Sequence, residues 1–405
     1  MSHDGSEDLL GGANIRLHSA TGRHAAQPDT FLAQLGRGRS PETGAISAPI
    51  YQTATFAHRD FDRGRGYDYS RTRNPTRDVL EEAIATLDGG VRGFAFASGM
   101  AALTTVGCLF QAGDHILLGE HLYGGTYRLV EQVLRRQGLE CSFVPMDEPA
   151  RVMEAMCPST RALICETPTN PLLRVSDIAA LADIAHEGGA VLIVDNTFLT
   201  PLRQRPLALG ADITVYSATK YIAGHNDLVA GLAVARDPAV GERLALYQNA
   251  LGTALGPMDA WLTVRGMKTL TLRLDRHEQS AAAVARHLQG HPAVAAVHYP
   301  GLPEDPGYAL NQRQATGAGG TIAFRLARPE AVREMIASLD LIIYAESLGG
   351  PESLITHPAN QTHRDVAPEL RARLGLDTGV LRLSVGLEAV EDILADLDQA
   401  LERAS

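Results

Sequence analysis

The sequence predicts an α/β fold in which a mostly parallel, seven-stranded sheet is followed by a smaller α+β domain. From residue 93 to residue 235, short apolar runs alternate with helical segments, which is typical of a parallel sheet covered by helices on both faces. After Trp261 the alternation stops and a long helical pattern begins. A chain of 405 residues is long enough for two or three domains, each with its own core.

Residues 1–65 are expected to form an N-terminal tail and arm involved in subunit contacts. Residues 1–27 mix Ser, His, Gly and charged side chains without periodicity, which is typical of a mobile tail. Residues 30–62 are rich in turn signals such as Pro41, Gly44 and Pro49. Because such an arm cannot bury a core of its own, we expect it to lie over another subunit.

Residues 66–262 are expected to form the large domain. Asn74-Pro75-Thr76 predicts a helix start, apolar residues recur through Leu87, and Gly89-Gly90 predicts the end. A later helix is expected to take Ser176 as its N-cap and to stop at Gly188. We expect seven strands in this domain, spanning residues 94–98, 115–118, 141–145, 162–166, 191–195, 213–217 and 228–234.

Residues 263–405 are expected to form the smaller domain. A helical pattern runs through Leu270, Leu274 and Val284 and leads away from the sheet. Residues 320–326 and 381–385 are predicted strands. Apolar residues between Val390 and Leu401 recur at helical spacing and predict a closing amphipathic helix.

Composition and charge exclude several classes of protein. The formal net charge of −11 and the lack of basic runs argue against nucleic acid or a membrane surface as a partner. No apolar run approaches about 18 residues, and no secretory signal pattern opens the chain. The four cysteines have no CxxC spacing, so neither a disulfide framework nor a metal site is predicted. We therefore expect a cytoplasmic protein.

The stretch of residues 216–231, YSATKYIAGHNDLVAG, carries the first chemical signal. A β-branched run at 212–215 leads into Ser217, Thr219 and Lys220, and a lysine beside a buried strand is costly unless it is paired. One interpretation is a lysine that forms a Schiff base with an aldehyde cofactor, whose phosphate the two hydroxyls bind. The alternative is a solvated lysine at a strand end.

Other polar groups also follow predicted strands, where ligands bind in open α/β sheets. Ser98-Gly99-Met100 opens a helix and can bind an anion, although such turns are common. Asp195-Asn196-Thr197 ends an apolar run, so Asp195 either meets a cation or caps the next turn. Asn170 either contacts a ligand or belongs to a simple turn. Together these groups match the needs of pyridoxal phosphate (PLP), namely a lysine, a phosphate cradle and a partner for the ring nitrogen.

The sequence resembles the Cys/Met-metabolism family of PLP-dependent enzymes, which includes cystathionine γ-synthase, cystathionine γ-lyase, cystathionine β-lyase and methionine γ-lyase. The resemblance runs from about residue 30 to the C-terminus, and it implies the aspartate-aminotransferase-like fold, fold type I. The matching motifs are YSRTRNPTR (69–77), ASGMAA (97–102), LYGGTYRL (122–129), ETPTNP (166–171), VDNTFLTP (194–201), SATKYIAGHND (217–227), AESLGGPESL (345–354) and LRLSVGLE (381–388).

The resemblance implies a role for each matching residue that would bind the cofactor. Lys220 is implied to hold PLP covalently and to carry protons, and Asp195, followed by Thr197, is implied to pair with the ring nitrogen. Tyr123 is implied to stack on the ring, and its service as a base is left open. The phosphate is implied to contact Ser98, Gly99, Met100, Ser217 and Thr219 of the same chain, and Tyr69 and Arg71 of a neighbouring subunit.

The resemblance also implies a substrate site. Arg382, aided by Asn170 and Ser347, is implied to bind the α-carboxylate of an amino acid. Less certain substrate contacts are implied for Arg128, Asp68, Glu346 and Asn249. The implied assembly is a homo-oligomer, a tetramer built from dimers that share active sites.

The expected activity is γ-replacement or γ-elimination on a homoserine- or sulfur-derived amino acid. Gly125 and the Ala345-Glu346-Ser347 run favour the γ-synthase and γ-lyase group. Gln361 and Arg364 depart from the family pattern, which indicates either an unusual substrate or drift. The alternatives are a specialised γ-elimination of a modified, for example halogenated, amino acid, and a catalytically silent PLP-binding paralogue.

Overall fold

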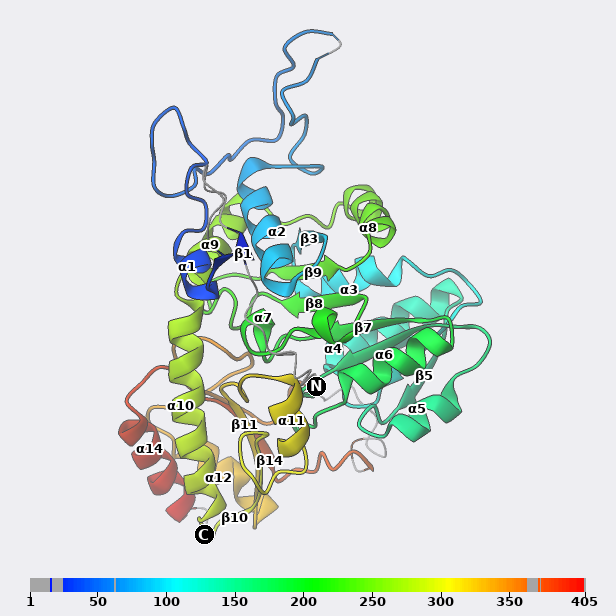
Figure 1. Ribbon diagram of the computed structural model, residues 1–405. Helices are drawn as coiled ribbons and strands as arrows, with labels where there is room; N and C mark the ends of the chain where they lie inside the picture. The colour runs from blue at the N-terminus through cyan, green and yellow to red at the C-terminus, as the bar shows by residue number, and fades with distance from the viewer. Residues whose placement is uncertain (1–14, 17–24, 62, 363–370, 372, 404–405) are drawn as a thin grey trace, which may run out of the picture.

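The computed structural model describes residues 15–16, 25–61, 63–362, 371 and 373–403, and these residues form two large sheets and one two-stranded sheet. A seven-stranded sheet belongs to the first two-thirds of the chain, and a five-stranded sheet belongs to the last third (Figure 1). This arrangement confirms the predicted α/β fold with a large, mostly parallel sheet and a smaller second sheet. The expected division of the chain at residues 65 and 262 stays a prediction.

The large sheet has the strand order β3-β9-β8-β7-β6-β4-β5. Strand β9 runs antiparallel to both of its neighbours, and the remaining pairs are parallel. All seven predicted strands are found, with ends displaced by up to three residues. Their bounds are Arg92–Phe96 (β3), His115–Gly119 (β4), Glu140–Val144 (β5), Thr160–Glu166 (β6), Val191–Asp195 (β7), Ile213–Ser217 (β8) and Gly231–Ala235 (β9).

Two of these displacements have local causes. The first strand stops at Phe96 rather than residue 98 because Ser98 turns away to cap the next helix, where its Oγ accepts the Ala101 N–H at 3.0 Å. The last strand begins at Gly231 rather than residue 228. Just before it, Ala230 exchanges hydrogen bonds with the side chain of Thr219.

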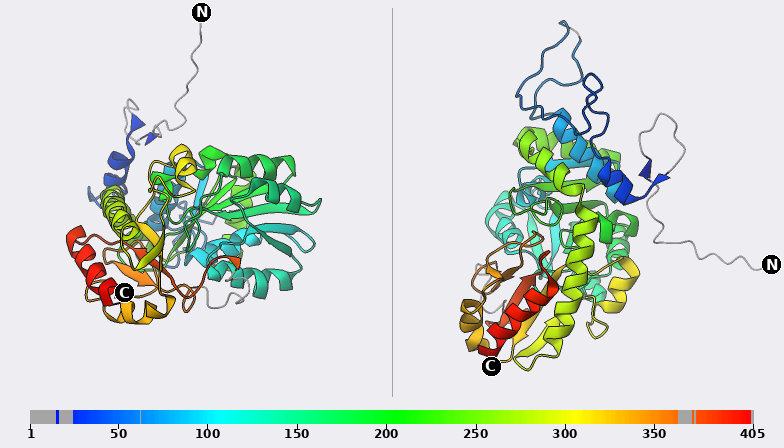
Figure 2. Two further views of the ribbon diagram at one scale, coloured as in Figure 1. Left: turned by 90° about the horizontal axis from the view of Figure 1, so that it is seen from below. Right: turned by 90° about the vertical axis from the view of Figure 1, so that its left-hand side faces the viewer.

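Helices cover both faces of the large sheet, so its strands are apolar on both sides (Figures 1 and 2). Successive residues of β4 show this, because Ile116 belongs to one buried apolar cluster and Leu117 to another. The helices of this part are Pro75–Asp88 (α2), Gly99–Gly107 (α3), Gly124–Leu129 (α4), Pro149–Ala155 (α5), Ile178–Glu187 (α6), Thr200–Arg203 (α7), Pro238–Leu251 (α8) and Pro257–Met267 (α9). Short π- or 3₁₀-helical turns span Val130–Leu134, Arg135–Gln137 and Pro206–Leu209.

One predicted helix cap is confirmed and one is wrong. Asn74 caps α2 through a bond from the Thr76 N–H to its side chain, and Gly89 ends that helix with a left-handed φ of 78°. Helix α6 takes Asp177 as its N-cap rather than Ser176, because the Asp177 carboxylate accepts the Ala180 N–H at 3.1 Å. The backbone N–H of Ser176 instead bonds to Thr167.

The second sheet has the order β10-β11-β14-β13-β12 and its own apolar cluster. The predicted strands at 320–326 and 381–385 correspond to β11 and β14, and the closing helix is α14 (Val390–Arg403). The sequence analysis missed the other three strands, two of which have only two or three residues. The strands are Val294–His298 (β10), Thr321–Leu326 (β11), Ile343–Tyr344 (β12), Leu354–Thr356 (β13) and Val380–Ser384 (β14), and the remaining elements are Leu270–Gln289 (α10), Tyr308–Gln314 (α11), Pro329–Ala331 (3₁₀) and Val332–Ala337 (α12).

The N-terminal region has little regular structure among the described residues. It contains a two-residue strand pair, Ile15–Arg16 (β1) with Ala25–Ala26 (β2), and one helix, Pro28–Ala33 (α1). Most of the predicted tail, residues 1–27, lies outside the described residues. The described residues between α1 and α2 extend away from the body, at the top of Figure 1, and their expected contact with another subunit stays a prediction. No helix in the described ranges is long and apolar enough to cross a membrane.

Asp396 is a buried carboxylate on α14 that we predict to be essential for the stability of the second sheet region. It accepts the backbone N–H groups of Asp340, Leu341 and Ile342 at 2.8, 3.0 and 2.8 Å. Asp396→Ala should lower the free energy of unfolding by about 3 kcal/mol, because three backbone donors, one of them fully buried, lose a charged acceptor. Urea unfolding measures the change. Glu402→Ala, exposed on the same helix, should change it by less than about 0.5 kcal/mol, and equal effects would contradict the assignment.

Candidate active site

The carboxyl ends of β6, β7 and β8 open onto a cavity of about 260 Å³. Residues from the second sheet region close its other side, so both parts of the chain contribute. Of the residues predicted for the site, those that line the cavity are Ser98, Gly99, Met100, Tyr123, Asn170, Asp195, Thr197, Ser217, Thr219, Lys220, Glu346, Ser347 and Arg382.

Lys220 follows β8 directly and carries the amine of the cavity. Its Nζ donates a hydrogen bond to Ser347 Oγ at 2.9 Å. Burial, reinforced by the nearby charge of Arg382, lowers the pKa of Lys220 to about 8. The chain has only one other lysine, Lys268, whose Nζ donates to the carbonyls of Ala33 and Leu35. The cavity therefore has a single lysine, and about a tenth of its amine is neutral at pH 7, far more than for a lysine of ordinary pKa.

Asp195 and Glu166 form a pair of buried carboxylates at the cavity. They are register partners at the ends of β7 and β6, so their side chains emerge from the same face of the sheet. Asp195 Oδ1 accepts the N–H of Thr197 at 3.0 Å and its hydroxyl at 2.5 Å. Burial raises the pKa of both carboxyls, and the neighbouring Asp195 raises that of Glu166 further. A cation bound beside Asp195 would favour its ionised form and offset the cost of burial. The two carboxylates therefore fit a protonated ring nitrogen as their partner.

Glu166 was missed as a site residue by the sequence analysis, although it opens the ETPTNP motif. Its Oε2 accepts the backbone N–H of Tyr123 at 2.9 Å, and it also accepts a backbone hydrogen bond from Asn170. The signal was available, because Glu166 follows an apolar strand run as Asp195 does. Glu166 thereby fixes the start of α4, where Tyr123, 41% exposed, faces the cavity.

The turn at residues 98–100 lies against β8 and β9 with almost no space to spare. A Cβ on Gly231 would lie 2.1 Å from the Ser98 carbonyl oxygen, so only glycine fits there. A Cβ on Gly99 would lie 3.0 Å from Ser217 Cβ. The close packing brings the start of α3 beside the hydroxyls of Ser217 and Thr219. A helix start beside hydroxyl groups is suited to a phosphate.

Arg382 is a buried guanidinium with only neutral partners. Its Nη1 donates to Asn170 Oδ1 at 2.8 Å, and its Nη2 donates to the Ser347 carbonyl at 2.9 Å and to Thr356 Oγ1 at 3.2 Å. The Nε has no hydrogen-bond partner within the described part of the chain. Burial lowers the pKa of Arg382 to about 10. A guanidinium that lacks a counter-ion in a cavity is suited to a carboxylate ligand.

Ser347 joins the two cations of the cavity. It has a left-handed φ of 111°, a conformation that costs a serine about 1–3 kcal/mol. In this conformation its carbonyl accepts from Arg382 and its hydroxyl accepts from Lys220. The strained backbone thus fixes the distance between the amine and the guanidinium.

Five predicted residues do not line the cavity of their own chain: Tyr69, Arg71, Asp68, Asn249 and Arg128. Tyr69 is 47% exposed, and Arg71 is also exposed and donates to the Asn249 carbonyl at 3.0 Å. Asp68 lies 3.3 Å from His58, and Arg128 belongs to α4. The prediction for Tyr69 and Arg71 concerns a neighbouring subunit, and it stays a prediction.

The segment expected to select the substrate is partly described. Gln361 does not line the cavity, and its Oε1 accepts the His357 N–H at 2.9 Å, whereas Thr362 does line it. Arg364 and His363 lie outside the described residues. His357 Nε2 lies 3.0 Å from the Thr378 carbonyl, and no cluster of potential metal ligands occurs within the described ranges.

Comparisons with known proteins identify the family of the chain. Residues 29–402 match the family described as Cys/Met metabolism PLP-dependent enzyme. A cystathionine γ-lyase of Bacillus subtilis is 48% identical over 92% of this chain and 98% of its own. A cystathionine β-lyase of the same organism is 46% identical over 89% of this chain and 92% of its own. The crystal structure of a cystathionine γ-synthase from Xanthomonas oryzae pv. oryzae with cystathionine superposes with a TM-score of 0.92 at 41% identity, covering 94% of this chain and 98% of that one.

We predict that Lys220 destabilises the cofactor-free protein below pH 8. The pKa of its amine falls from 10.5 in the unfolded chain to about 8 in the fold, so folding disfavours the ammonium form. The cost is complete below pH 8 and vanishes above about pH 10.5, where the amine is neutral in both states. Lys220→Met should therefore raise the free energy of unfolding at pH 7 by roughly 3 kcal/mol.

Urea unfolding of the cofactor-free protein between pH 7 and 10 measures this difference. The gain should shrink steadily as the pH rises from 8. Arg136→Met, at an exposed position, should show no such trend. A gain that stays constant with pH would mean that packing, rather than the buried charge, is responsible.

Proposed function

Because the chain belongs to the Cys/Met-metabolism family of PLP-dependent enzymes, we propose that it replaces or eliminates the γ-substituent of a homoserine- or sulfur-derived amino acid. The observation that carries this proposal is the convergence of Lys220, Asp195 and Arg382 on one cavity. These three side chains provide an amine, a carboxylate and a guanidinium. They match the aldehyde and ring nitrogen of PLP and the carboxylate of an amino acid.

The cavity residues divide into two sets: one would hold the ring of the cofactor with its aldehyde, and the other would hold its phosphate. Lys220 would bind its aldehyde carbon covalently, Asp195 its ring nitrogen and Tyr123 its ring face. The turn at residues 98–100, with Ser217 and Thr219, would hold its phosphate. When bound, PLP supplies an electron sink that stabilises negative charge on the carbons of the amino acid.

Asp195 is suited to keep the ring nitrogen protonated. The Thr197 bonds fix one of its oxygens, and Thr197 Oγ1 in turn accepts the Ser217 N–H at 2.8 Å. The carboxylate is therefore held in one orientation by the strand that also leads to Lys220. Glu166, the less readily ionised partner, adds an acceptor for the backbone of Tyr123 without requiring a second full negative charge.

Arg382 would bind the α-carboxylate of the substrate. Asn170 and Thr356 hold the guanidinium in position through neutral acceptors, so its positive charge remains available for an anion. Ser347 bonds to both Arg382 and Lys220, so a substrate bound by Arg382 would have its α-carbon near the amine. Proximity of this kind is a large part of catalysis in such sites.

Lys220 would also move protons on the substrate. With a pKa of about 8, the free amine can accept a proton from the α-carbon and return it to a neighbouring carbon near neutral pH. The flexible side chain suits a base that serves more than one carbon. Tyr123 stays a candidate for a second base on the same cavity wall.

One feature of the sequence favours γ-chemistry among the activities of the named relatives. Ala345 stands where β-lyases of the family carry a larger aromatic residue. The silent-paralogue alternative lacks support, since the amine, the ring wall and the guanidinium all line the cavity. No contact among the described residues favours a halogenated substrate.

We further propose that the active enzyme is a cytoplasmic homo-oligomer, a tetramer built from two dimers, in which Tyr69 and Arg71 complete the phosphate site of a neighbouring subunit. The support for the shared site is that both side chains are exposed and that neither lines the cavity of its own chain.

Borohydride reduction of the cofactor-loaded protein should fix the pyridoxyl group on Lys220. Since the chain has only two lysines, peptide mapping gives a clear answer. Lys220→Ala should bind PLP weakly, without labelling. A label on Lys268 would overturn the assignment, and an unlabelled wild-type protein would overturn the PLP proposal itself.

Arg382→Lys should lower kcat/KM for cystathionine about 30- to 100-fold, mostly through KM. A lysine ammonium cannot reproduce the paired bonds of a guanidinium to a carboxylate, a loss of roughly 2–3 kcal/mol. Steady-state assays should score oxoacid release and thiol incorporation separately. Arg136→Lys, exposed on the surface, serves as the control. An unchanged KM would contradict the carboxylate role of Arg382.

A further inference from the structure

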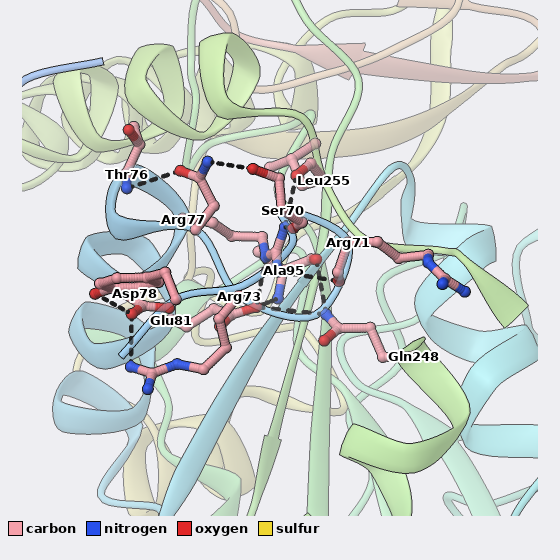
Figure 3. Close-up of polar contacts among 12 residues, drawn as sticks. Ser70, Arg71, Arg73, Thr76, Arg77, Asp78, Glu81, Ala95, Gln248 and Leu255 are labelled. Carbon is pink, nitrogen blue, oxygen red and sulfur yellow. Dashed lines mark hydrogen bonds and ion pairs between the residues drawn. The ribbon is translucent and has the colours of Figure 1, made fainter. Parts of the chain in front are cut away.

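Arg77, on the first turns of α2, is a fully buried arginine that bonds mainly to backbone (Figure 3). Its side chain is 1% exposed. Its Nη1 donates to the carbonyls of Ser70 at 2.7 Å and Leu255 at 3.4 Å, and its Nη2 donates to the carbonyl of Arg71 at 3.2 Å. The planar guanidinium therefore holds two consecutive carbonyls of the segment that precedes the helix.

Glu81 balances the charge of Arg77 and connects it to the sheet (Figure 3). The Arg77 Nε lies 3.3 Å from Glu81 Oε1, one turn further along α2. The same oxygen accepts the Ala95 N–H at 2.9 Å, and Gln248 donates to the Ala95 carbonyl at 3.0 Å. Ala95 belongs to β3, the edge strand that leads into the turn at residues 98–100. The segment before α2 is thus attached to the part of the sheet that carries the phosphate turn.

Further bonds fix the same segment from its other side. Asn74 Nδ2 donates to Ser70 Oγ at 2.9 Å, and Thr72 Oγ1 donates to the side chain of Asn249 at 3.1 Å. The backbone at residues 70–72 is therefore held at several points. In contrast, the side chains of Tyr69 and Arg71 remain exposed and do not reach the cavity of their own chain.

The charge of Arg77 needs an explanation beyond the stability of α2. A buried ion pair costs desolvation, and apolar residues of similar volume often serve stability equally well. What an apolar residue cannot supply is the fork of donors that fixes the Ser70 and Arg71 carbonyls. The contacts thus indicate that the position of this segment, rather than the packing of the helix, is what the arginine provides.

We propose that Arg77 is a positioning residue that holds Tyr69 and Arg71 so that they reach the cofactor phosphate of a neighbouring subunit. This inference rests on the proposed function, in which those two side chains complete the neighbour's site. Arg77 acts through the segment and does not touch the cofactor. Its loss should therefore weaken the binding of the phosphate group specifically, and in the partner's cavity.

The first test compares the affinity of cofactor-free protein for PLP and for pyridoxal, which lacks the phosphate, by absorbance titration. The variant is R77M/E81Q, in which the Gln still accepts from Ala95 and no unpaired charge is left buried. Its affinity for PLP should fall about tenfold or more relative to E81Q, whereas its affinity for pyridoxal should stay the same. Equal losses for both ligands, or no loss, would overturn the proposal.

Arg77→Lys keeps the charge beside Glu81 but cannot donate to both carbonyls with a planar fork. It should lose part of the affinity for PLP and none of that for pyridoxal. If R77M/E81Q does not fold, this variant decides, and a native affinity for PLP would overturn the proposal.

Hybrid oligomers separate this inference from the proposed function. Subunits with R77M/E81Q are co-expressed with Lys220→Ala subunits under two different tags, and the mixed species is purified. Its only working sites take Lys220 from the first subunit and the intact segment from the second, so they should bind PLP with native affinity. The same experiment with Arg71→Ala in place of R77M/E81Q gives the reference. If the Arg71→Ala hybrid does not regain native affinity for PLP, the shared site of the proposed function is wrong. If the Arg71→Ala hybrid regains it and the R77M/E81Q hybrid does not, the role of Arg77 is wrong.

Discussion

Two buried carboxylates at the ends of neighbouring parallel strands impose the main constraint on this molecule. Asp195 and Glu166 are register partners, so they face the same cavity, and burial disfavours the ionisation of both. The surrounding groups separate their roles. Thr197 bonds orient Asp195 toward an incoming cation, while backbone N–H groups occupy Glu166. Asp195 is thereby available to pair with a cation, whereas Glu166 holds the neighbouring backbone in place.

Within the part of the chain that the structure describes, the two cations of the cavity, Lys220 and Arg382, form hydrogen bonds only to neutral groups. Lys220 bonds to a hydroxyl, and Arg382 bonds to an amide, a hydroxyl and a carbonyl, so neither has a hydrogen-bonded anion among the described residues. Each therefore remains ready for a ligand group, and the resulting cost is visible in their lowered pKa values. Ser347, with its left-handed backbone, holds both at a fixed separation. The strained backbone and the buried cations lower the stability of the fold locally, but they keep the side chains of the site in position before any ligand binds.

Features that arise from residues close together in the sequence were predictable, whereas features that arise from contacts between distant segments were not. The strands of the large sheet were predictable because most of them are apolar runs buried on both faces. The polar residues after them were predictable because parallel strands bring their carboxyl ends together. The short strands β12 and β13 were missed, since two or three residues carry no periodicity. The strained conformation of Ser347 and the pairing of Glu166 with Asp195 depend on contacts between distant segments, which no local pattern contains. The helix predicted to take Ser176 as its N-cap begins one residue later, because Asp177 caps it instead.

Three polar side chains, Arg73, Arg203 and Gln361, are accounted for by their local contacts. Arg73 bonds to Asp78 at 2.7 Å and covers the ring of Tyr67. Arg203 bonds to Asp275 and Glu278 on α10, and thus joins α7 to the long helix of the second part. Gln361 bonds to the backbone of its own turn. All three polar side chains therefore serve local structure, and none lines the cavity. Arg364 lies outside the described residues, and its part in the choice of substrate stays a prediction. Among the described residues that line the cavity, Phe198 and Val229 are apolar and Thr362 is small, so this part of the wall offers apolar contact to an uncharged chain.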